Sequence, residues 1–128
     1  MSLQYDYLPE GIHQFKFHKP NRHSVDEYLK ILQQVLPALH PDEPWLSILD
    51  MSIAGLIPVR YALTKIFSFS KPYLDVHVNR TLVLHNAGTI GQVMQSLVNP
   101  INNNLLFLPP DKRAEGIKWL LEQEIISA

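Results

Sequence analysis

Short apolar segments alternate with helix-like segments over most of this chain, and no other feature of the sequence constrains its fold as strongly. Residues 45–50, 80–85 and 105–108 are short and mostly apolar, as buried strands are. The segments between and after them carry apolar residues at steps of three and four, which is typical of amphipathic helices. This alternation predicts a largely parallel sheet whose crossover connections are helices that cover at least one face.

A β-hairpin is expected near the start of the chain. Two runs with strand-favouring aromatic residues flank a Pro-Glu-Gly turn sequence at residues 9–11. Within residues 12–18, alternation places His13, Phe15 and Phe17 on one face of the second strand. The polar residues between them take the other face, which we expect to be wet.

The first helix is predicted over residues 25–39, where apolar residues follow a helical period. Ser24 and Glu27 stand at the spacing of a capping box, which satisfies two backbone N–H groups at the start of a helix. Pro37 falls in the last turn and is expected to bend or end the helix, because proline has no N–H to donate.

Three further helices are predicted. Pro58 suits the first position of a helix that the segment 68–72 interrupts. Thr89 begins a second capping-box pattern, and Asp111 opens a last helix. The predicted fold class is therefore α/β, with an N-terminal β-hairpin followed by alternating α/β units. We expect a four- to five-stranded, mostly parallel but mixed sheet covered by about four helices, in a single domain spanning residues 1–128.

Composition narrows the classes of partner. The chain holds 11 Lys and Arg against 12 Asp and Glu, a formal net charge of −1, which argues against nucleic acid or an anionic membrane surface. The absence of cysteine excludes disulfides, thiolate-bound zinc and thiol nucleophiles. No apolar run is long enough to cross a bilayer, and residues 1–6 lack the features of a signal peptide. We therefore expect a cytoplasmic protein with no integral membrane association.

Three stretches carry a family resemblance. Residues 46–52 look like a central strand leading into an L-D-x-S turn, residues 80–84 like the next strand, and residues 105–120 like a closing strand and helix. In these stretches the chain resembles the STAS-like superfamily and, more closely, the small bacterial SpoIIAA-like proteins related to anti-sigma-factor antagonists. The resemblance implies a STAS/SpoIIAA-like fold and a regulatory or protein-interaction role. Regulatory members carry a phosphorylatable serine just past the central strand, but the matching position near Leu56 has no hydroxyl, so a module without the phosphoacceptor is implied.

Six histidines raise the question of a metal site, but their spacing argues against one. His13 and His18 lie on opposite faces of one predicted strand and cannot reach the same ion. The sequence contains neither an H-E-x-x-H nor an H-x-H pair. We therefore expect structural or solvated histidines, with no metal ion and no cofactor.

The most suggestive polar cluster follows the predicted strand 80–85. His85, Asn86, Gly88 and Thr89 stand where a strand ends and a helix begins. The N–H groups of such a helix start can hold a phosphate or a carboxylate, and ligands favour this edge of α/β sheets. A tight turn capped by Thr89 explains the same residues, so both interpretations stay open.

Asp50 and Ser52 follow the central strand and are expected at the same edge of the sheet as His85. These residue types could form a nucleophilic triad, although Ser52 lacks the G-x-S-x-G sequence that exposes a serine hydroxyl. A turn held by the aspartate and the serine is the alternative. Residues 51–59 are almost free of charge and form either core or an exposed patch for a partner or a lipid tail.

Together these features favour a non-enzymatic module that binds a protein partner or a second copy of itself as a homodimer. The docking edge is expected at residues 50–60 and 85–91. The alternatives are a protein that binds a small apolar or anionic ligand, such as a lipid or a nucleotide, and a small hydrolase that uses Ser52 and His85. The candidate binding residues are Asp50, Ser52, Leu56, Arg60, His85, Asn86, Gly88 and Thr89.

Overall fold

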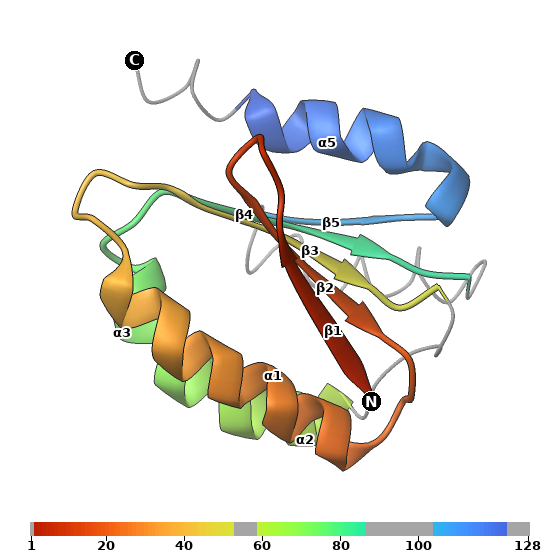
Figure 1. The fold of residues 1–128 in the computed structure, drawn as a ribbon, viewed down its shortest axis with the longest axis horizontal. Helices are drawn as coiled ribbons and strands as arrows, with labels where there is room; N and C mark the ends of the chain where they lie inside the picture. Colours follow the sequence, from red (N-terminus) through yellow and green to blue (C-terminus); the bar gives the residue numbers. More distant parts are fainter. Residues whose placement is uncertain (1, 53–58, 87–103, 123–128) are drawn as a thin grey trace.

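Five strands form one mixed sheet, and their order across the sheet is their order along the chain (Figure 1). The computed structural model describes residues 2–52, 59–86 and 104–122. The strands are β1 (Leu3–Tyr7), β2 (Ile12–Phe17), β3 (Trp45–Asp50), β4 (Asn79–Leu84) and β5 (Leu105–Leu108). β1 runs antiparallel to β2, whereas the pairs β2–β3, β3–β4 and β4–β5 are parallel. The predicted hairpin and the largely parallel, mixed sheet are confirmed.

The hairpin turn needs the glycine that the sequence supplies. Gly11 has a φ of 85°, in the left-handed region that side chains with a Cβ rarely adopt. Beyond it, His13, Phe15 and Phe17 are all buried, and the residues between them are partly exposed. The buried face predicted for this strand is confirmed, whereas the opposite face is wet only in part, because Ile12 on that face is fully buried.

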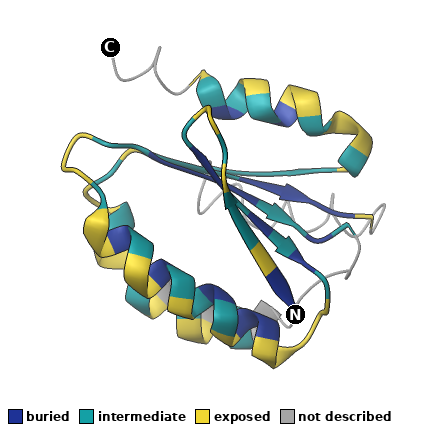
Figure 2. Cartoon of the chain, viewed as in Figure 1, coloured by how far each residue is buried: buried dark blue, intermediate teal, exposed yellow. Residues whose placement is uncertain are grey.

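Helices lie on both faces of the sheet, and their buried residues face it (Figures 1 and 2). On one face lie α1 (Arg22–Val35), η1 (Leu36–Ala38), α2 (Val59–Ala62), the π-helical turn η2 (Leu63–Phe67) and α3 (Ser68–Leu74). On the other face lie η3 (Pro110–Lys112) and α5 (Arg113–Leu121). The helix predicted from Thr89 lies outside the described residues.

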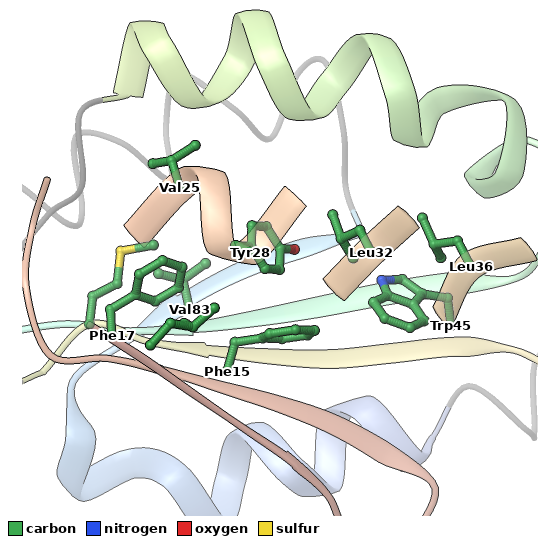
Figure 3. Close-up of a cluster of buried hydrophobic side chains, with 10 residues drawn as sticks. Phe15, Phe17, Val25, Tyr28, Leu32, Leu36, Trp45 and Val83 are labelled. Carbon is green, nitrogen blue, oxygen red and sulfur yellow. The ribbon is translucent and has the colours of Figure 1, made fainter. Parts of the chain in front are cut away.

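The larger core lies between α1 and the sheet (Figure 3). The rings of Phe15 and Tyr28 meet edge to face with their centroids 4.7 Å apart. Each large apolar side chain that is fully buried stabilises the fold by about 1.5–3 kcal/mol. The buried members of this core are Leu3, Phe15, Phe17, Val25, Tyr28, Leu32, Leu36, Trp45, Met51 and Val83.

The smaller core lies under α5, which approaches β4 closely. A Cβ built on Gly116 would lie 2.4 Å from Cδ2 of Leu82, so only glycine fits between this helix and this strand without a shift of the neighbours. Arg80 fixes the helix further, because its guanidinium lies 4.7 Å from the Trp119 ring centroid and donates to the Trp119 carbonyl at 2.6 Å. The buried members of this core are Ile12, Leu46, Ile48, Leu82, Leu84 and Leu120.

The predicted start of the first helix was wrong by three residues. Helix α1 begins at Arg22, and Asn21 is its N-cap, because the Asn21 side chain accepts a hydrogen bond from the Ser24 N–H at 2.9 Å. The Ser24 hydroxyl instead donates to the Lys19 carbonyl at 2.6 Å. The end of the helix agrees with expectation, since α1 gives way to a 3-10 turn that contains Pro37.

The predicted break at residues 68–72 was also wrong. The helical stretch continues through α3 to Leu74, with Pro72 inside it. Proline removes one backbone hydrogen bond and crowds the carbonyl four residues earlier. The π-helical turn η2 directly precedes α3, and its wider bonding takes the backbone out of regular α-helical register before the proline.

Candidate functional site

The loop that follows β3 is closed by the carboxylate of Asp50. One oxygen of this carboxylate accepts hydrogen bonds from the Ser52 N–H at 3.0 Å and from the Ser52 hydroxyl at 2.5 Å. Between them, the Met51 N–H donates to the Leu84 carbonyl at 2.8 Å and continues the pairing with β4. Asp50 therefore holds an Asx-type turn, as its place at a strand end suggests.

The residues that follow β4 lie beside this turn. The backbone N–H of His85 donates to the Leu108 carbonyl at 3.1 Å, which extends the pairing of β4 with β5. The His85 side chain is buried, and burial lowers its pKa. Asn86 is exposed, and its Nδ2 donates to the Ser52 carbonyl at 2.6 Å. A side-chain bridge therefore joins the segments that follow the two adjacent parallel strands.

Half of the predicted binding residues are thus described together at one edge of the sheet: Asp50, Ser52, His85 and Asn86. Arg60 belongs to the first turn of α2, and its side chain lies outside the described part of the chain. Leu56, Gly88 and Thr89 also lie outside the described residues.

The geometry of this edge is that of a structural turn. A serine nucleophile passes its proton to a general base, commonly an imidazole. The Ser52 hydroxyl instead donates to the Asp50 carboxylate, which also accepts the backbone N–H that closes the turn. The Ser52 hydroxyl and the Asp50 carboxylate are therefore both engaged in holding the loop.

Two kinds of site are absent from the described ranges 2–52, 59–86 and 104–122. Within them, no group of three or more His, Asp or Glu side chains is placed to hold a metal ion. None of the helices described there has both the length and the apolar character that a membrane span requires.

A second polar feature lies at the opposite end of the sheet, around the buried side chain of His13. Its imidazole Nδ1 lies 2.7 Å from the Tyr5 hydroxyl. Its ring stacks on Trp45 with centroids 4.4 Å apart and lies 4.7 Å from the ring of Tyr7. Burial lowers the His13 pKa from 6.5 to about 4, against the smaller opposing effect of the Glu43 charge. His13 is therefore a neutral imidazole at pH 7.

This histidine has one nitrogen that the surrounding protein leaves unpaired. The Nε2 atom of His13 is buried and has no hydrogen-bond partner among the described residues. Sequence reasoning treated His13 only as a structural histidine. The alternation of Tyr5 and Tyr7 places both rings on the same face of the hairpin as His13, but the contact with Trp45 depends on how β3 lies beside β2, which no local pattern shows.

Comparison with known proteins identifies no relative: no family model, no curated protein and no solved structure matches the chain.

Proposed function

We propose that the chain is a non-enzymatic regulatory or protein-interaction module of the STAS/SpoIIAA-like type, without the phosphoacceptor serine. Its working surface is the edge formed by residues 50–60 and 85–91. The α/β fold with a mixed five-stranded sheet is compatible with this type. The observation that carries the proposal is the hydrogen bond from Asn86 to the Ser52 carbonyl, which ties the two segments of this edge together.

A hydrogen bond between residues 52 and 86 suits docking, because backbone that is already held at these two points loses less conformational entropy when a partner binds. The polar side chains at this edge bind backbone groups. The Asp50 carboxylate accepts a hydrogen bond from the Ser52 N–H, and the Asn86 amide donates one to the Ser52 carbonyl. Met51 is buried in the larger core, so the later apolar residues of the segment 51–59, among them Leu56, supply the contact with the partner, which is another protein or a second copy of the chain.

Leu56→Asp tests this surface, because a carboxylate within an apolar contact removes affinity. The matched control is Gln33→Asp, which adds the same charge at an exposed position of α1. Sedimentation velocity reports self-association, and a photo-crosslinking residue at position 60 or at position 33 reports partners in cells, with the Asn86 side chain left in place. We expect Leu56→Asp to abolish dimers or the crosslinks from position 60, with an unchanged thermal midpoint.

Equal sedimentation of the parent chain and both variants, with the same crosslinks from positions 60 and 33, would overturn the proposal. A thermal shift with phosphate compounds that is lost in Gly88→Val would replace it with an anion-binding function at the same edge.

A further inference from the structure

A hollow lies between the hairpin and the C-terminal end of α1, at the opposite end of the sheet from the proposed docking edge. Its volume is about 410 Å³, which falls within the range of about 300–1,000 Å³ that is common for ligand pockets. Residues from β1, β2, α1 and the segment before β3 line it, among them Tyr5, Tyr7, His13, Val35, Leu39 and Glu43.

One wall of the hollow is aromatic. Tyr7 is 58% exposed, although its ring lies beside the buried stack of His13 on Trp45. The face of an aromatic ring carries partial negative charge, so an exposed tyrosine beside a hollow attracts an organic cation. Val35 and Leu39 provide apolar surface in the same hollow.

The charge around the hollow has one sign. Glu43 contributes a carboxylate, and neither lysine nor arginine is among the described residues that line the hollow. Helix α1 ends at Val35, so the negative end of its dipole lies at the same place. His13 adds no positive charge at pH 7, since its imidazole is neutral there.

From these features we propose that the hollow binds a small organic cation of the quaternary or alkylated ammonium class. The ammonium group lies between the Tyr7 ring and the Glu43 carboxylate, and the alkyl part of the ligand lies against Val35 and Leu39. This site is separate from the proposed docking edge and does not depend on it.

The test compares choline with 3,3-dimethylbutan-1-ol, which has the same shape but a neutral carbon in place of the ammonium nitrogen. Each compound is titrated into the ¹⁵N-labelled full chain and followed by amide chemical shifts. We expect choline to give saturable shifts at Tyr7, His13, Val35 and Glu43, and the alcohol to give none that saturate.

Variants separate charge from shape. Glu43→Gln is expected to weaken choline binding roughly two- to fivefold, the effect of a partly exposed ion pair. The control Glu115→Gln, an exposed position on α5, leaves binding unchanged. Tyr7→Phe retains the ring and the affinity, whereas Tyr7→Leu weakens binding by about two- to fivefold.

Four results would overturn the proposal. They are the absence of saturable shifts with choline, shifts centred away from the hollow, equal binding of the neutral alcohol, and equal affinities of the parent chain and Glu43→Gln.

Discussion

Gly116→Ala measures how tightly α5 is seated on the sheet, because two known effects oppose each other at this position. In an unconstrained helix the change stabilises by about 0.8–1 kcal/mol, since alanine is the better helix former. Here the new Cβ would lie 2.4 Å from Cδ2 and 2.6 Å from Cδ1 of Leu82. Leu82 is fully buried, so its side chain has little room to move away.

Overpacking of this kind costs about 1–3 kcal/mol. Subtracting the gain in helix propensity leaves an expected net loss of about 1–2 kcal/mol, because the contact lies at the severe end of the range. Urea unfolding followed by circular dichroism measures the free energy of unfolding, and an unchanged dependence on urea shows that the same unfolding transition is compared.

A second substitution isolates the clash. Leu82→Ala removes Cδ1, Cδ2 and Cγ, the three atoms that the new methyl group would meet within 3.1 Å. In that background Gly116→Ala is expected to change sign and to stabilise by up to about 1 kcal/mol. Ala114→Gly, at an exposed position of the same helix, measures the propensity effect without the clash.

The reasoning is refuted if Gly116→Ala stabilises the parent chain by as much as Ala114→Gly destabilises it. That result would mean that α5 stands far enough from β4 to accept the methyl group.

Three further predictions concern single residues. Since the folded-state pKa of His13 is about 4 and its ordinary value is 6.5, the stability that its neutral form provides is complete above pH 6.5 and is lost as the pH falls toward 4. At about 1.36 kcal/mol per pKa unit this amounts to at most about 3 kcal/mol, and His13→Phe should flatten that part of the pH profile of unfolding. Asn21→Ala should lower the free energy of unfolding by about 0.5–2 kcal/mol through loss of the helix cap, whereas Asn21→Asp, which keeps the capping oxygen, should not; an unchanged free energy of unfolding of Asn21→Ala in urea would contradict the assignment of Asn21 as the cap. Asn86→Ala removes the bridge to Ser52 and should speed amide exchange of the backbone around residue 52 while costing only about 0.5–1.5 kcal/mol of global stability, so unchanged exchange there would count against a tied edge.

Local patterns in the sequence were sufficient where one element decides the outcome. Alternation alone placed His13, Phe15 and Phe17 on the buried face, and Pro37 marked the end of α1. They failed at the start of α1, because Asn21 and Ser24 are both residue types that commonly cap helices. In the structure Asn21 is the cap, and the Ser24 hydroxyl donates to the Lys19 carbonyl.

The same distinction holds for the functional surfaces. The expectation that strand ends share an edge was enough to bring Asp50, Ser52 and Asn86 together. The ring stack of His13 on Trp45 needs contact between β2 and β3, which are far apart in the sequence. Contacts of that kind are properties of the packed chain.

The match between strand order and chain order bears on how the protein is made. Each strand that leaves the ribosome finds its partner, the preceding strand, already present, and none has to insert between two that are paired. The surface beneath α5 is covered last, because that helix follows every strand it covers. Until α5 docks, Ile48, Leu82 and Leu84 lack the helix that covers them among the described residues, and this is the stage at which a chaperone would be most useful.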